Sequence, residues 1–299
     1  MKKRISKFLF SAYRYVFLFC LSIIILYPLL YSFSVAFRPA EQLYDPLVIY
    51  VPRSLTTANI GLAMDYLHYW TALGNTLLIT LAVTAIQVFV CATIGYGLAR
   101  YPFWLTKAAF GLVMLMIVVP PQTTLIANYL NFRYFDFFGF RFNLIDTPWT
   151  MILPALTGVG LKNGLYIFIF RQFFRGLPKD LEEAAAIDGC GEIKTFFRIM
   201  LSSAIPAIIT CTLFSFVWQW NDNVYVSMYM RNVKTLMNEL TSLFGRSGYI
   251  MQYELKRNPY ESIVLLQAGV FLVILPPLVL YAFLQKYFIE SIERTGLVG

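Results

Sequence analysis

Six stretches of the chain contain no charged side chains or almost none, and each is long enough to cross a bilayer. They cover residues 16–37, 74–99, 108–130, 149–170, 204–226 and 262–284. A helix of about 20 apolar residues crosses the hydrocarbon core of a bilayer. Backbone N–H and C=O groups in lipid must pair within their own segment, unless strands close a barrel. Because the runs lack the period-two alternation of barrel strands, the sequence predicts an all-α integral membrane protein with six transmembrane helices.

The composition agrees with a polytopic membrane protein and excludes several other classes. Of the 299 residues, 59% are hydrophobic and 13% are charged, which is too apolar for a soluble domain of this size. The net charge is +8, but Lys and Arg lie at the edges of apolar runs, so we expect no nucleic-acid partner. Four isolated cysteines have no metal-type spacing and predict neither a disulfide framework nor a zinc site.

The distribution of Lys and Arg predicts the orientation, because positive residues are retained on the cytoplasmic side. With the N-terminus inside, the inner segments hold 14 Lys and Arg residues and the outer segments hold 9. The sequence therefore predicts a cytoplasmic segment 1–15, a membrane domain 16–287 and a cytoplasmic tail 288–299. No small-residue cleavage site follows the first apolar run, so 16–37 is interpreted as a retained span.

The inner segment between the fourth and fifth stretches predicts a helix-turn-helix. Asp180 and Glu183 have the spacing of a capping box, and the first helix is expected to end near Ile187. Gly189 permits the left-handed turn that ends a helix. In the second helix one apolar face is expected, made of Ile193, Phe196, Phe197, Met200 and Leu201. From this pattern alone, a solvated connector at the membrane surface remains an equal alternative.

A longer gapped motif covers the same segment: Glu183-Ala-Ala, three residues, Gly189, nine residues, then Ile199-Met-Leu201. It resembles the signature loop of bacterial ABC-importer permeases, with Ser202 where the family usually has Pro. The resemblance implies that the loop, 177–202, is a coupling helix that docks into a cleft of a cytoplasmic ATPase. Carried over to this chain, the ATPase-coupling residues are Glu182, Glu183, Ala184, Ala185, Asp188 and Gly189.

Further matches extend the resemblance to the carbohydrate, maltose-type branch of these permeases. They are Asn75-Thr-Leu, Tyr96–Phe103, Arg171-Gln-Phe-Phe, Trp220-Asn-Asp, Gln285–Glu290 and Gly296–Gly299. The resemblance implies a type I ABC importer permease in the bacterial cell membrane, forming half of the pathway for a sugar-like solute. The implied partners are a second homologous permease subunit, a cytoplasmic ABC ATPase dimer, an extracytoplasmic solute-binding protein and the lipid bilayer.

The chain lacks the Gly-x-x-x-x-Gly-Lys-[Ser/Thr] motif of a P-loop. We therefore expect no enzyme activity and no cofactor in this chain, with ATP and Mg bound by the partner ATPase. A peptide, a polyamine or a phosphoester remains an alternative solute. An intramembrane transferase that uses the acidic residues of the inner face is an alternative from another class, and a passive channel is a third.

Two groups of residues are candidates for the solute pathway. A lysine at a helix centre costs about 2.5 to 3.5 kcal/mol on insertion scales, so Lys162, with Asn163, is expected to face a watery cavity or a partner. Snorkelling to the membrane surface is the alternative. Trp218, Trp220, Asn221 and Asp222 combine aromatic faces with polar groups, which suits a sugar, although Trp is also common at membrane interfaces. Gln87, Gln122 and Asn128 are further polar residues of these spans. For each of them, helix packing is an equal alternative to a solute contact.

Overall fold

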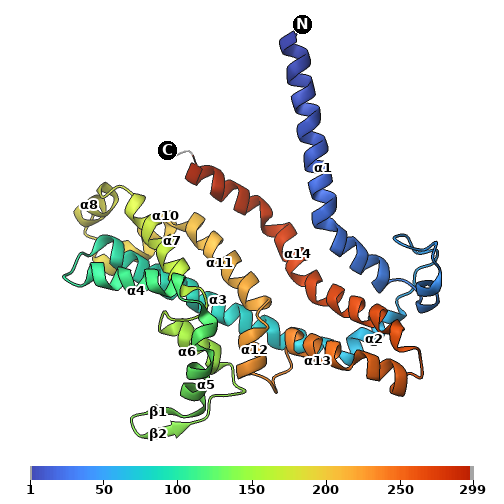
Figure 1. Ribbon diagram of the computed structural model, residues 1–299. Helices are drawn as coiled ribbons and strands as arrows, with labels where there is room; N and C mark the ends of the chain where they lie inside the picture. The colour runs from blue at the N-terminus through green and yellow to red at the C-terminus, as the bar shows by residue number, and fades with distance from the viewer. Residues whose placement is uncertain (1, 297–299) are drawn as a thin grey trace. The chain divides into compact units, whose positions relative to one another are not determined.

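The computed structural model describes the backbone of residues 2–296 and the side chains of residues 9–283 and 285. The last three residues of the predicted tail lie outside the described residues. The chain is mostly helical, which confirms the all-α class (Figure 1). It divides into two compact units: unit 1 contains the chain up to Trp70 and Glu239–Pro276, and unit 2 contains Thr71–Asn238 and the chain from Pro277.

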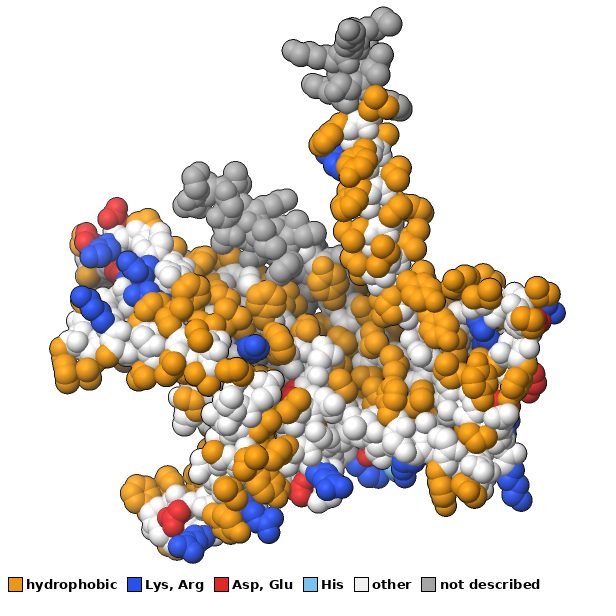
Figure 2. All heavy atoms as spheres, in the orientation of Figure 1, with side chains coloured by type: hydrophobic (Ala, Val, Ile, Leu, Met, Phe, Trp, Pro, Cys, Tyr) orange, Lys and Arg blue, Asp and Glu red, His pale blue; other side chains and the backbone are white. Residues whose placement is uncertain are grey.

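Unit 1 is built around the ends of two long helices, α1 and α14. Val35 of α1, Ala40 and Val264 of α14 form a buried cluster, and Ser32 Oγ donates to Gln267 Oε1 at 2.5 Å. Most of α1 is exposed. Hydrophobic side chains lie along the coloured part of this helix in Figure 2. The elements are α1 (Lys2–Ala36), η1 (Ala40–Tyr44), α2 (Ala58–Tyr66), part of α13 (Leu236–Tyr249), η4 (Ile250–Glu254), η5 (Pro259–Glu261) and the first part of α14 (Ser262–Gly296).

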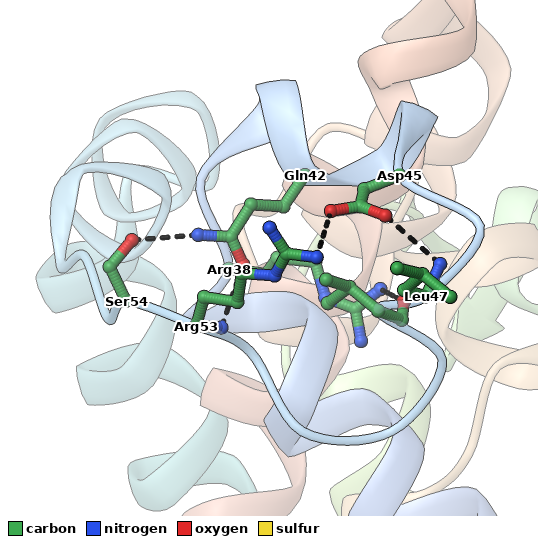
Figure 3. Close-up of polar contacts among 7 residues, drawn as sticks. Arg38, Gln42, Asp45, Leu47, Arg53 and Ser54 are labelled. Atoms are coloured by element: carbon green, nitrogen blue, oxygen red, sulfur yellow. Dashed lines mark hydrogen bonds and ion pairs between the residues drawn. The ribbon is translucent and has the colours of Figure 1, made fainter.

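The loop after α1 is ordered by its own polar side chains (Figure 3). The buried guanidinium of Arg38 donates to two backbone carbonyls of the loop, at 2.9 and 3.0 Å. Gln42 Nε2 donates to Ser54 Oγ at 2.7 Å, and Arg53 forms an ion pair with Asp45 at 2.8 Å. These bonds link both ends of the loop and order it outside its short helix η1.

Unit 2 contains the remaining helices and a short hairpin. In order they are α3 (Tyr69–Arg100), α4 (Thr106–Val118), η2 (Pro121–Thr124), α5 (Leu125–Arg133), β1 (Phe135–Phe137), β2 (Phe140–Phe142), α6 (Trp149–Leu156), α7 (Asn163–Gly176), α8 (Asp180–Ile187), α9 (Glu192–Thr195), η3 (Phe196–Met200), α10 (Leu201–Ser203), α11 (Ile205–Trp220) and α12 (Val224–Tyr229). The strands pair antiparallel, with Phe135 opposite Phe142. Figure 1 places the hairpin and α8 at opposite ends of this unit.

Helix α7 forms the centre of unit 2, where it packs against α4 and α11. Phe170 and Phe174 of α7 are fully buried together with Met200 and Cys211. The helices approach closely through glycine: a Cβ on Gly95 of α3 would lie 2.6 Å from the Cβ of Phe170. Small residues of this kind let membrane helices bring their backbones together.

Three helical segments are long and apolar enough to span a membrane by themselves: Leu9–Ala36, Tyr69–Arg100 and Pro259–Phe283. Two further pairs qualify only as bent spans. Thr106–Val118 and Pro121–Arg133 meet at 97°, and Glu192–Ser203 and Ile205–Trp220 meet at 75°. The predicted span 108–130 is therefore a bent pair of helices, whereas the second bend lies at 203–205, at the start of the predicted span 204–226. The prolines at 120 and 121 remove two backbone donors and explain the first bend.

Candidate functional site

The predicted span 149–170 is not one helix but two, α6 and α7, separated by an irregular segment 157–162. Pro154 lies inside α6, and Gly158 follows with φ +77°. Lys162 then adopts the left-handed conformation (φ 63°) directly before α7. Proline and positive-φ residues end a regular helix, so this sequence interrupts the span at its middle. We call residues 157–162 the internal break.

A buried polar cluster holds the internal break in place. Gln87 of α3 lies at its centre, fully buried, and its Nε2 donates to the carbonyl of Leu161 at 2.8 Å and to Asn163 Oδ1 at 2.5 Å. Its Oε1 accepts from Ser215 Oγ of α11 at 2.6 Å and from Gln219 Nε2 at 3.4 Å. The Gln87 side chain thus bonds to the broken backbone and joins it to α3 and α11. Buried polar groups remote from water require such hydrogen-bond partners. We call this set the glutamine cluster.

A cavity of about 530 Å³ lies against the internal break. Its walls come from α4, the bend at 119–124, α5, α6, α7 and the α11–α12 region, and they are mostly apolar. The polar and charged side chains that line it are Thr124, Asn128, Thr150, Lys162, Gln219, Tyr225 and Tyr229. A largely apolar cavity of this volume with a few hydrogen-bonding groups is typical of a small-molecule site. We call it the break cavity.

Lys162 is the predicted pathway residue that the structure places in the break cavity. Its Nζ lies 4.5 Å from the centroid of the Trp218 ring, so the structure brings these two candidates together. A cation over an indole face is an attractive arrangement. Trp218 is half exposed, whereas Asn163 is fully buried in the glutamine cluster and is not among the residues that line the cavity.

The other predicted pathway residues lie elsewhere in the described part of the chain. Trp220 is 2% exposed and stacks on Phe216 of the same helix. Asp222 is also buried, and its Oδ1 accepts the backbone N–H of Tyr225 at 3.1 Å, which supports the first turn of α12. Asn221 donates to the carbonyl of Val217. These three residues therefore serve local structure in this conformation and are not part of the cavity lining.

The predicted helix-turn-helix is present at 180–201. Helix α8 ends at Ile187, Gly189 has φ +73°, and α9 begins at Glu192, as the sequence indicated. The predicted capping box is wrong, because Lys179 is the N-cap residue and makes no side-chain capping bond. Only part of the predicted apolar face is covered: Phe196 and Met200 are buried, but Ile193 is 78% exposed.

Some of the predicted coupling residues are exposed at the helix-turn-helix, and others are turned toward the rest of unit 2. Glu183, Ala184, Asp188 and Gly189 are exposed, and nothing lies within 4 Å of the Cβ position of Gly189. Ala185 is buried. Charged side chains surround α8 in Figure 2. We call residues 188–191 the surface bend.

Glu182 faces inward and links α8 to α3. Its carboxylate accepts from Tyr96 Oη at 2.8 Å and lies 3.3 Å from Arg100 Nε, and Arg100 also donates to the carbonyl of Leu177 at 2.7 Å. Arg100 is nearly buried, so this ion pair is shielded from water and holds more firmly than a surface pair. The link therefore ties α8 to the C-terminal end of α3.

Ser215 and Gln219 are site residues that sequence reasoning missed, and Gln87 was considered only as a solute contact or a packing residue. Ser215 and Gln219 are four residues apart in an apolar run, so they share one helix face, and this spacing was a detectable signal. Tyr96 and Arg100 have the same spacing. In neither case did the sequence indicate the partner.

Comparison with known proteins places the chain among transport proteins. The family described as "Binding-protein-dependent transport system inner membrane component" matches residues 91–294. The arabinooligosaccharides transport system permease protein AraQ of Halalkalibacterium halodurans is 28% identical over 283 residues, covering 93% of each chain. The maltodextrin transport system permease protein MdxG of Bacillus subtilis is 28% identical over 288 residues, covering 95% of each chain.

A third relative reaches higher identity over a shorter region. The osmoprotective compounds uptake permease protein GgtD of Synechocystis is 30% identical over 251 residues, which cover 82% of this chain and 77% of the relative. A solved structure of a bacterial ABC transporter that imports the acidic polysaccharide alginate matches with a TM-score of 0.76. It covers 95% of this chain and 98% of that chain, at 21% identity, and therefore supports the fold alone.

Proposed function

Because the chain belongs to the family of binding-protein-dependent transport system inner membrane components, as its 183–201 signature predicted, we propose that it is the permease half of an ATP-driven sugar importer. In this proposal it pairs with a second, homologous permease subunit. A cytoplasmic ATPase dimer binds ATP and Mg, and an extracytoplasmic protein delivers the solute. The chain itself catalyses no reaction.

The observation that carries the proposal is the surface bend and its attachment. Asp188 and Gly189 of the bend and Glu183 of the adjoining α8 are exposed, so another protein can reach them. Directly below it, Glu182 ties α8 to Arg100 of α3. An ATPase that grips the bend would thus move α3, and the internal break packs against α3 through Gln87. ATPase closure and the break cavity are then mechanically connected.

The proposed topology has six spans with both termini in the cytoplasm. Five spans are the three continuous helices and the two bent pairs, and α6 with α7 supplies the sixth across the internal break. The excess of Lys and Arg on the α8 side supports this orientation. The hairpin and α8 lie at opposite ends of unit 2, as opposite membrane faces require (Figure 1).

The proposed solute is a sugar or oligosaccharide that passes through the break cavity. The cavity combines apolar walls with hydroxyl and amide groups of Thr, Asn, Gln and Tyr, which match the C–H faces and hydroxyls of a saccharide. Two of the relatives carry oligosaccharide names, which agrees with this chemistry.

A matched pair of glycine substitutions tests the docking of the ATPase. Gly189 and Gly139, at the turn of the β1–β2 hairpin, both have positive φ and open space around the Cβ position. Gly189→Trp, like Glu183→Lys, is expected to abolish co-purification of the ATPase and uptake, whereas Gly139→Trp leaves co-purification intact. Equal recovery of the ATPase with all three variants would refute docking at the surface bend.

A further inference from the structure

The break cavity has an unbalanced charge. Among the described residues that line it, Lys162 is charged and the others are apolar or neutral polar, so no carboxylate of the lining compensates the ammonium. The ion pairs of the described side chains involve other basic residues. A charge in a largely apolar cavity interacts more strongly with an ion there than it would in water. The cavity is therefore built to attract an anion and to repel a cation.

The backbone fixes where this charge lies. Lys162 occupies a left-handed position, which L-residues with a side chain adopt at a cost and glycine adopts freely. Gly158 and Gly160 lie in the same segment. Position 162 nevertheless holds a lysine, although glycine would adopt this backbone conformation without cost. The Lys162 side chain is then held over the Trp218 ring, and that contact leaves the N–H donors of its ammonium available.

The surroundings of Lys162 add to the positive potential. Lys162 is the N-cap of α7, a helix of 14 residues whose N-terminal end carries a partial positive charge. Asn163, the next residue, is fully engaged in the glutamine cluster and offers no negative group. Thr124, Asn128 and Thr150 supply neutral hydrogen-bonding groups for the rest of a solute.

We propose that the solute is a saccharide that carries an anionic group, a carboxylate or a phosphate, and that this group pairs with Lys162 in the break cavity. The proposal rests on the proposed function and specifies its substrate class. Trp218 positions the ammonium, and the neutral groups of the cavity bind the sugar hydroxyls. A neutral saccharide would leave the ammonium without a counter-ion at this point of the pathway.

The test is ATP-dependent import into proteoliposomes that contain the complete transporter with its binding protein. The probes form two matched pairs: digalacturonate with neutral galactobiose, and trehalose 6-phosphate with neutral trehalose. We expect one acidic probe to be imported at least about tenfold faster than its neutral counterpart, as a charge-assisted contact predicts. The acidic probe that is imported identifies the anionic group as carboxylate or phosphate.

Substitutions at Lys162 assign the preference to the permease, because the binding protein is the same in every preparation. Lys162→Met is expected to slow import of the acidic probe about tenfold, whereas Lys162→Arg retains the preference. Lys107→Met, at an exposed lysine of α4 outside the cavity lining, serves as the control and is expected to behave as wild type.

Each other outcome counts against a defined part of the proposal. Faster import of a neutral probe, or an acid preference that survives Lys162→Met, overturns the role of Lys162 and leaves the sugar importer standing. Import of none of the four probes, with ATP hydrolysis intact, counts against both the anionic saccharide and the proposed function.

Discussion

The internal break and the surface bend use the same backbone device in opposite surroundings. In both, two helices of unit 2 are joined by a short segment with positive-φ residues: Gly158 and Lys162 in the break, and Gly189 in the bend. At the break, the fully buried Gln87 donates to the carbonyl of Leu161. The bend lies at the surface, and its N–H groups donate to carbonyls of α8, from Gly189 to Ala186 at 3.0 Å and from Cys190 to Ala185 at 2.9 Å. The comparison teaches that an interruption inside a membrane helix requires a dedicated polar partner, whereas one at the surface remains available for docking.

The largest expected effect tests the need for that partner. Gln87→Leu removes the donor to the carbonyl of Leu161 and to the amide oxygen of Asn163, at about 1 to 3 kcal/mol for each buried group. We expect the free energy of unfolding in detergent to fall by about 3 kcal/mol. Thr93→Val, at an exposed position of the same helix, is the control. Equal thermal midpoints for both variants would mean that the break is stable without the glutamine cluster.

The second prediction concerns the close packing beside the internal break. A Cβ on Gly164 would lie 2.9 Å from the Cβ of Met116, whereas one on Gly176, at the far end of α7, meets nothing within 4 Å. Gly164→Ala is therefore expected to lower the free energy of unfolding by about 2 kcal/mol, and Gly176→Ala to change it little. Thermal unfolding of the purified variants measures the difference. Similar values would show that α4 moves aside without cost.

The third prediction concerns the link below the surface bend. A double-mutant cycle of Arg100→Met and Glu182→Gln is expected to give a coupling free energy of about 1.5 kcal/mol, because this pair is largely shielded from water. Each single variant should also reduce the solute imported per ATP hydrolysed, since α8 then moves without α3. Additive effects on stability together with unchanged coupling of transport to hydrolysis would argue against the link.

The smallest effect separates the two glycines of the surface bend. Gly189 has φ +73°, whereas Gly191 has φ −71°, and both Cβ positions are open. Gly189→Ala is expected to destabilise the protein by roughly 1 kcal/mol, and Gly191→Ala to stabilise it by about 0.4 kcal/mol or more. Chemical denaturation of both variants checks the opposite signs. The same sign for both would show that the bend tolerates other conformations.

The surface bend was predictable from the sequence and the internal break was not. Gly189 and the apolar spacing after it are local signals, and the two helices begin and end where they indicate. The break depends on Gln87 bonding to Asn163 and to Ser215, which lie 76 and 128 residues away. Periodicity carries no information on such pairings, and Pro154 alone did not distinguish a kink from a break. For the same reason Glu182 was expected on the docking surface, whereas Arg100 holds it inward.

Helix α1 has a consequence for how the chain is made. The most apolar window of its segment Leu9–Ala36 has no buried residues, so most of its length depends on no later part of the chain for support. The helix is therefore free to leave the ribosome and enter the bilayer before the rest of the chain has been synthesised.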